Sequence, residues 1–197
     1  MSEVTACGIV CPTDWVPLPL EPSDDVRSWA KSTAAELCER ARAAGHELDR
    51  RALRKDLRSR AEDSRGRGPF YAFAFYPDGF DSAIALLEVD LIHPDETVPE
   101  LSLDWLTDTF SADDFGPPDV RRLDLPVGPA VRIRQNFAAD APPSSSPGIL
   151  LETLTYGILP TDAEIAVMVL GSWTLPGIAE EIEAAVDDMA RTVTVDF

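Results

Sequence analysis

The amino-acid sequence predicts an α+β protein, in which an antiparallel sheet of about six strands packs with N-terminal and C-terminal helices. Three observations predict this class. Apolar residues recur at helical spacing mainly near the two ends of the chain. Strand-like segments joined by short turns occupy the middle, and short turns connect antiparallel neighbours. Each helix has one apolar face, which it must bury on the sheet.

Length and composition predict a single domain over residues 1–197. The chain has 197 residues, of which 45% are apolar. A chain of this size buries roughly 70% of the surface of its unfolded form, so we expect one core. The longest apolar runs are shorter than the ~20 residues of a membrane helix. Residues 1–10 carry Glu3 and no basic cluster typical of a secretory signal. We therefore expect a soluble cytoplasmic protein.

The N-terminal third of the chain predicts a strap and two helices. Prolines are frequent up to residue 22, so residues 15–20 are expected to be extended. Ser23 is a suitable N-cap for a first helix, which Gly45 would end. A second helix is expected over 47–63, with leucines inward and arginines outward. Such a helix can contact RNA, DNA or an anionic membrane, but interleaved acidic residues favour pairs within the protein.

The remainder of the chain predicts the sheet and two further helices. A short helix is expected near 102–110 and a final helix over 178–192. Alternation and turn residues predict six strands, at 70–76, 82–92, 119–125, 130–137, 149–159 and 164–174.

Three parts of the sequence carry a resemblance to a known fold. They are the segment Trp15-Val-Pro-Leu-Pro-Leu, the segment Leu125-Pro-Val-Gly-Pro-Ala-Val-Arg and the helix at 178–192. With the order of elements, they resemble the sandwich shared by the photosystem PsbP proteins and the Ran-binding Mog family. The bacterial relatives of that fold include secretion-system chaperones. The resemblance implies the fold alone, because the family has diverse partners and no shared active site. The long basic helix at 47–63 departs from the family pattern.

Charge divides the chain into two unequal parts. The chain has 17 basic and 35 acidic residues, a formal charge of −18. Residues 21–67 hold twelve basic and ten acidic side chains, whereas residues 68–197 hold five basic and twenty-three acidic ones. The larger part would repel phosphate, so we expect neither a nucleic-acid nor a membrane partner. An acidic surface can steer a basic protein toward it, although solubility alone would also explain the charge.

No catalytic, cofactor-binding or metal-binding residue is assigned from the sequence. Cys7 and Cys11 lack the two-residue spacing of a zinc knuckle. The segment from His93 to Glu96 is expected to be a solvated turn rather than a metal site. Nucleophilic catalysis has no Gly-x-Ser-x-Gly motif to support it. Arg132 and Arg134 could hold an anion, but a cross-strand ion pair with Glu152 is the preferred interpretation.

We therefore expect a non-enzymatic bacterial binding protein that uses an acidic surface, such as an adaptor, a secretion chaperone or a toxin-neutralising partner. Low lysine and abundant Ala, Pro and Asp indicate a GC-rich bacterial genome. The alternatives are a hydrolytic enzyme with a carboxylate site not visible in the sequence, or a structural subunit of an assembly.

A docking surface for a basic protein is predicted around residues 100–119. This segment has six acidic side chains, no basic one and several apolar ones. Apolar anchors within a charged rim are typical of a steered interface. We assign the partner contacts to Trp105, Asp108, Asp113, Asp114 and Phe115. The alternative is that the apolar residues cover the sheet. The oligomeric state is left open.

Overall fold

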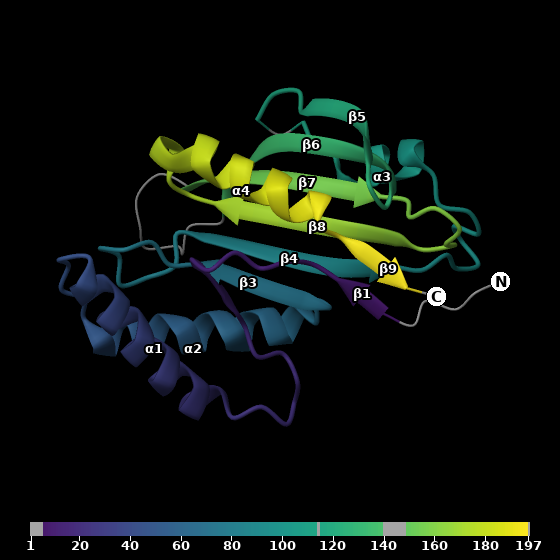
Figure 1. The fold of residues 1–197 in the computed structure, drawn as a ribbon. Coiled ribbons are helices and arrows are strands. Elements are labelled where there is room, and N and C mark those ends of the chain that lie inside the picture. Colours follow the sequence, from purple (N-terminus) through teal and green to yellow (C-terminus); the bar gives the residue numbers. More distant parts are fainter. Residues whose placement is uncertain (1–5, 114, 140–148, 197) are drawn as a thin grey trace. The chain divides into compact units, whose positions relative to one another are not determined.

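The computed structural model describes residues 6–113, 115–139 and 149–196. Its described part contains four α-helices, a seven-stranded antiparallel sheet and a two-stranded sheet, which confirms the predicted α+β class (Figure 1). The chain divides into two compact units, one of residues 11–88 and one of residues 1–10 with 89–197. The single domain over 1–197 stays a prediction. Among the described helices, none combines the length and apolar character needed to span a membrane.

The unit of residues 11–88 contains two helices and the first strands of the sheet. The strap is a strand, because β2 pairs antiparallel with β3 and places Trp15 opposite Phe75. Their aromatic rings stack with centroids 5.3 Å apart. In chain order the elements are β2 (Trp15–Pro17), α1 (Val26–Ala43), α2 (Arg50–Arg67), β3 (Tyr71–Phe75) and β4 (Ala85–Ile92), the last of which continues into the other unit.

Both helices of this unit begin after an aspartate. The Asp25 carboxylate accepts hydrogen bonds from the Arg27 and Ser28 amides, at 3.1 and 3.0 Å, so α1 begins at Val26. The prediction of Ser23 as the N-cap is therefore wrong. Asp49 caps α2 in the same way, and the helix ends at Gly68, which has a φ of 76°. The second helix is thus shifted to 50–67, because its cap lies two residues beyond the predicted start.

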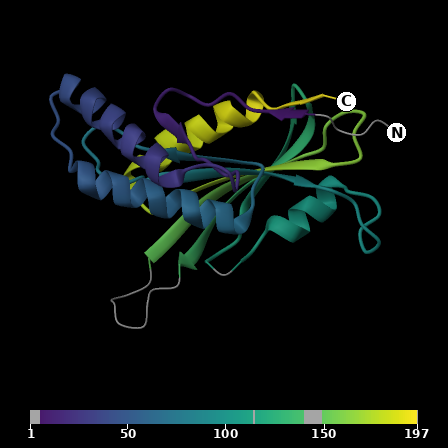
Figure 2. The ribbon, with the colours of Figure 1, turned by 90° about the horizontal axis from the view of Figure 1, so that it is seen from below.

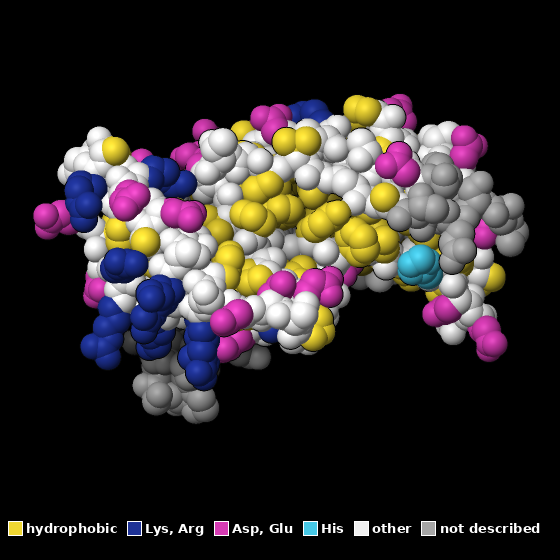
Figure 3. All heavy atoms as spheres, turned by 60° about the horizontal axis from the view of Figure 1, so that its bottom comes forward, with side chains coloured by type: hydrophobic (Ala, Val, Ile, Leu, Met, Phe, Trp, Pro, Cys, Tyr) yellow, Lys and Arg dark blue, Asp and Glu magenta, His cyan; other side chains and the backbone are white. Residues whose placement is uncertain are grey.

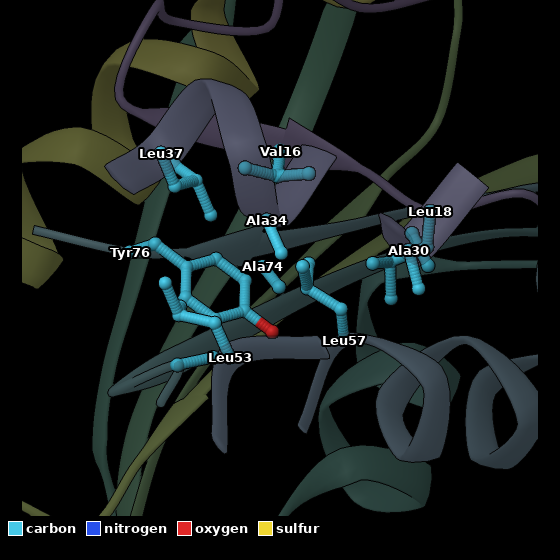
Figure 4. Close-up of a cluster of buried hydrophobic side chains, with 11 residues drawn as sticks. Val16, Leu18, Ala30, Ala34, Leu37, Leu53, Leu57, Ala74 and Tyr76 are labelled. Atoms are coloured by element: carbon cyan, nitrogen blue, oxygen red, sulfur yellow. The ribbon is translucent and has the colours of Figure 1, made fainter. Parts of the chain in front are cut away.

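The core of this unit lies between the two helices and the strands (Figure 4). Leu53 and Leu57 of α2 are fully buried, as are the small residues Ala30 and Ala34 of α1. Their side chains gather with Val16, Leu18, Leu37, Ala74 and Tyr76. With the apolar faces of the amphipathic helices buried, their charged residues lie on the opposite faces, in contact with water.

The carboxylate of Asp56 accepts three hydrogen bonds next to this core. The Tyr76 hydroxyl donates to the Asp56 carboxylate at 2.8 Å, and the Ala83 amide donates to the same oxygen at 2.9 Å. Arg60 donates to it from α2 at 3.3 Å. Burial raises the pKa of the Tyr76 phenol, and the charge of Asp56 raises it further. The buried hydroxyl is therefore satisfied rather than available for chemistry.

The second unit holds the long strands of the sheet, in the order β8-β7-β6-β5. The two-stranded sheet pairs Cys7 with Val195, near the two ends of the chain. The sequence predicted neither of its strands, because three residues are too few to show an alternation. The elements are β1 (Ala6–Gly8), α3 (Leu103–Phe110), β5 (Asp119–Leu125), β6 (Gly128–Ala139), β7 (Ile149–Ile158), β8 (Ala166–Trp173), the short 3₁₀ helix η1 (Pro176–Ile178), α4 (Ala179–Arg191) and β9 (Thr194–Asp196).

Helices α3 and α4 lie on opposite faces of these strands (Figure 2). Alternate residues of β6 point to the two faces, because side chains along a strand alternate. Val131 and Ile133 join the apolar cluster with Leu106 of α3, whereas Arg132 bonds Glu183 and Asp187 of α4. One face is therefore apolar under α3, and the other contains a buried network of charges under α4.

We expect the Cys11 thiol to react slowly with alkylating reagents. Its Sγ donates to the carbonyl oxygens of Pro12 and Trp15, each at 3.4 Å. Burial raises the pKa of Cys11 to about 11, and the nearby charge of Asp14 adds to this shift. Since only the thiolate reacts, the iodoacetamide rate at pH 8 should be at least about tenfold below that of the unfolded chain and should rise up to pH 11. Peptide mass spectrometry measures this rate, and equal rates in the folded and urea-unfolded protein would contradict the prediction.

Candidate functional site

The predicted docking segment forms helix α3 and the loop that follows it. Ser102 begins the helix, because its hydroxyl accepts a hydrogen bond from the Trp105 amide at 3.1 Å. Asp104 lies in the first turn, where a negative charge interacts favourably with the helix dipole. The short helix near 102–110 is thus confirmed, and its first residue is Leu103.

The apolar side of α3 covers the sheet. Leu106 is fully buried against Val131, Ile133 and Ala166. Leu101, Leu103, Trp105 and Phe110 are partly buried and pack against the same cluster. The sequence assigned the Trp105 side chain to a partner contact. In the structure this side chain is partly buried and packs against the protein's own core. The interpretation that these apolar residues cover the sheet is confirmed for this group.

The acidic residues of the segment differ in their surroundings. Asp104 pairs with Arg122, and Asp119 pairs with Arg121 at 2.6 Å. Asp108 and Asp113 are exposed, and among the described residues neither has an ion-pair partner.

Two further residues were assigned to the partner surface. Phe115 lies close to the exposed acids in the sequence, and 54% of its surface is exposed. Asp114 lies outside the described residues. Of the five residues predicted to contact a partner, Asp108, Asp113 and Phe115 are therefore exposed in the structure.

A recess lies at the start of the same segment. Its volume is about 480 Å³, and Leu101, Leu159 and Ile165 contribute to its apolar lining. Glu100 and Glu164 also line it, and both are exposed. Neither glutamate has an ion-pair partner within the described ranges. We name the exposed residues Glu100, Glu164, Asp108, Asp113 and Phe115 the acidic surface, of which Glu100 and Glu164 line the recess. The sequence missed Glu164, because only the fold brings residue 164 next to residue 100.

A buried glutamine fixes the end of α3. The Gln135 side-chain amide donates to the Phe110 carbonyl at 2.6 Å, and its oxygen accepts from the Ala112 amide at 2.8 Å. Gln135 is only 6% exposed. Its two bonds tie the loop that carries Asp113 to strand β6. The position of this part of the acidic surface is therefore set by the sheet.

The buried charges under α4 are paired with one another. Arg134 pairs with Glu152 of β7, which confirms the predicted cross-strand ion pair, and with Glu183 at 2.8 Å. Arg132 bonds Asp187 at 2.9 Å. The Tyr156 hydroxyl donates to Asp187 at 2.6 Å, and burial followed by this bond raises the pKa of Tyr156. Three carboxylates surround the two guanidinium groups, so neither arginine is free to hold an anion and the network is structural.

The turn from His93 to Glu96 has a structural role. The Asp95 carboxylate accepts from the Thr97 and Val98 amides, each at 2.7 Å. This bonding is typical of an aspartate that stabilises a turn. Throughout 6–113, 115–139 and 149–196, no three His, Cys, Asp or Glu side chains lie close enough together to hold a metal ion.

These features describe an α+β protein whose second unit has an acidic surface, part of which is a recess lined by both apolar and acidic side chains. No protein-family model matches the chain, and no curated protein matches it. The chain is similar in fold to LpqN of Mycobacterium tuberculosis, a protein involved in cell envelope biogenesis. The TM-score is 0.51 at 10% sequence identity, over 97% of this chain and 83% of the LpqN chain. This likeness concerns the fold alone.

Proposed function

We propose that this chain is a non-enzymatic bacterial binding protein that docks a basic protein on its acidic surface. The observation that carries the proposal is the recess of about 480 Å³, in which apolar side chains lie next to the unpaired carboxylates of Glu100 and Glu164. An adaptor, a secretion chaperone and a toxin-neutralising partner are all roles of this kind. The likeness to LpqN, a protein of cell envelope biogenesis, is compatible with a bacterial protein of this kind.

The charge balance of the second unit supports this choice of partner. Residues 1–10 and 89–197 contain five basic and twenty-one acidic residues. All five arginines already form ion pairs with acids of the same unit, namely Arg121, Arg122, Arg132, Arg134 and Arg191. The excess of negative charge therefore has no compensating cation in the unit. A field of one sign raises the association rate of an oppositely charged protein.

The recess offers a contact site for a basic side chain of the partner. A lysine or arginine side chain has an apolar stem and a charged end. Its stem would contact Leu101, Leu159 and Ile165, while its charge would lie beside Glu100 or Glu164. The exposed ring of Phe115 adds an apolar contact near Asp113 in the chain. Apolar anchors with a polar rim are the usual composition of protein interfaces.

We expect the double variant Glu100→Gln, Glu164→Gln to weaken binding of a basic probe about three- to tenfold and to reduce its salt dependence. The probe is a synthetic peptide that alternates lysine with leucine, and its association is measured by biolayer interferometry at low and high salt. The control is Glu180→Gln, Glu181→Gln, which changes the same net charge at two exposed acids of α4. Equal losses in the two variants would show a general field without a site and would contradict the assignment.

The two alternative functions predict different results. A hydrolytic enzyme with a carboxylate site would show turnover in a broad hydrolase screen. A structural subunit would form a symmetric homo-oligomer, which light scattering during size-exclusion chromatography measures. Either result, together with a lack of basic-peptide binding, would replace the proposed function.

A further inference from the structure

The other unit contains a groove of opposite charge. It lies between α1 and α2 and has a volume of about 820 Å³. Lys and Arg side chains gather in one area of the surface (Figure 3). We name this groove the basic groove, because six cations line it: Arg27, Lys31, Arg51, Arg54, Lys55 and Arg58.

Helical geometry explains why the cations converge. Residues 51, 54, 55 and 58 follow the i, i+3, i+4, i+7 spacing, so they share one face of α2. Arg27 and Lys31 lie one turn apart on α1. The opposite face of α2 is buried through Leu53 and Leu57. The core therefore holds the two basic rows side by side.

The cations of the groove have little compensation inside the protein. Arg58 pairs with Glu62 at 2.7 Å. Among the described residues, the other five have no ion-pair partner. The acid in the lining is Asp25, whose carboxylate already caps α1. The expectation that the basic helix pairs within the protein is right for Arg58 and wrong for the three other groove cations of that helix. Like charges that share a helix face repel one another, so an anion would be stabilising there.

We propose that the basic groove binds a compact phosphate-bearing ligand with two or more phosphate groups. Each phosphate monoester carries about −1.5 to −2 charges at neutral pH, so two or three groups would balance the lining. Carboxylates of an acidic peptide would need five or six residues for the same charge. Four of the six cations are arginines, whose planar donors bind phosphate oxygens in pairs.

The charge of the whole chain favours a compact ligand. The chain carries −18, and residues 11–88 are close to neutral, with twelve basic and fourteen acidic residues. A long polyanion would extend beyond the six cations of the groove, and the rest of the chain carries a large negative charge. A small ligand stays within about 8 Å of the cations. Physiological salt largely screens its interaction with charges that lie farther away. The proposal is independent of the proposed function, because its residues lie in the other unit.

The test is titration calorimetry of the full chain with tripolyphosphate at physiological salt. We expect binding, and we expect the variant Arg54→Gln, Lys55→Gln to weaken it at least about tenfold. The matched control is Arg42→Gln, Arg50→Gln, which removes two exposed cations of α1 and α2 that do not line this groove. The control should bind within about twofold of the unchanged protein. Circular dichroism should show the same fold for all three proteins.

A second arm identifies the source of the phosphate. Phosphatidylcholine vesicles with and without phosphatidylinositol bisphosphate are sedimented with each variant. Binding to the phosphorylated vesicles but not to tripolyphosphate assigns the groove to a lipid headgroup, and the reverse result assigns it to a free phosphate compound. Three results would overturn the proposal: no binding of either probe, equal losses in the two double variants, or poly-glutamate binding as tight as tripolyphosphate with the same loss in the groove variant.

Discussion

The variant Gly128→Ala is expected to lose about 3–5 kcal/mol of unfolding free energy. A Cβ atom at this position would lie 2.2 Å from the Leu159 carbonyl oxygen and 3.0 Å from the Thr161 amide nitrogen. Hydrogen bonds of 2.9 Å hold both neighbours, from Leu159 N to Pro129 O and from Thr161 N to Val127 O. Gly128 also has a φ of 153°, which L residues rarely adopt. Because backbone atoms cannot rotate away, the turn between β5 and β6 would have to shift.

Urea denaturation measures this loss, and Gly116→Ala provides the control. Gly116 has a φ of 96°, but a Cβ atom there would meet nothing within 4 Å. Its substitution should cost about 1 kcal/mol, from backbone strain alone. The difference between the two variants isolates the steric overlap with residues 159–161. Equal losses would mean that the overlap is relieved and that the explanation is wrong.

The variant Arg134→Met is also expected to lose about 3–5 kcal/mol, because it leaves a buried carboxylate without its cation. The side chain of Glu152 is 8% exposed and pairs with Arg134. Its second oxygen has no hydrogen-bond partner among the described residues. The guanidinium also lies 4.8 Å from the ring centre of Trp173, a contact that methionine would not reproduce.

Two companion variants separate charge from packing. Arg134→Met with Glu152→Leu removes both charges, so it should recover most of the loss. Arg191→Met removes a cation from an exposed pair with Asp188 and should cost less than about 1 kcal/mol. Thermal and urea unfolding measure all three variants. A double variant as unstable as Arg134→Met would show that the loss does not come from the unpaired Glu152.

Much of the candidate site could be predicted from the local sequence. The run of acids and apolar residues after residue 100 indicated a charged helix with an apolar side, and α3 has this form. The sequence could not distribute its residues between core and surface. Trp105 packs on the sheet cluster while Phe115 is exposed, because this outcome depends on which strands lie beneath each side chain.

The basic groove shows the same limit. The sequence predicted a basic helix with ion pairs inside the protein, and Arg58 forms such a pair with Glu62. Pairing of the remaining groove cations depends on whether an acid from another element reaches them. Strand β4 supplies Glu88 to Arg67, at 2.6 Å, but no acid approaches Arg54 or Lys55 closely enough for an ion pair among the described residues.

The sequence alone determined the helices, most of the strands and the division of charge along the chain. These features depend on spacing and composition within short segments, and residues a few positions apart impose them through local geometry. Only the tertiary structure decided where the charges act. It joined Glu100 to Glu164, buried the Arg134–Glu152 pair under α4 and aligned two basic rows between α1 and α2. Electrostatic interactions depend on distance and burial, and these are set by contacts between residues far apart in the chain.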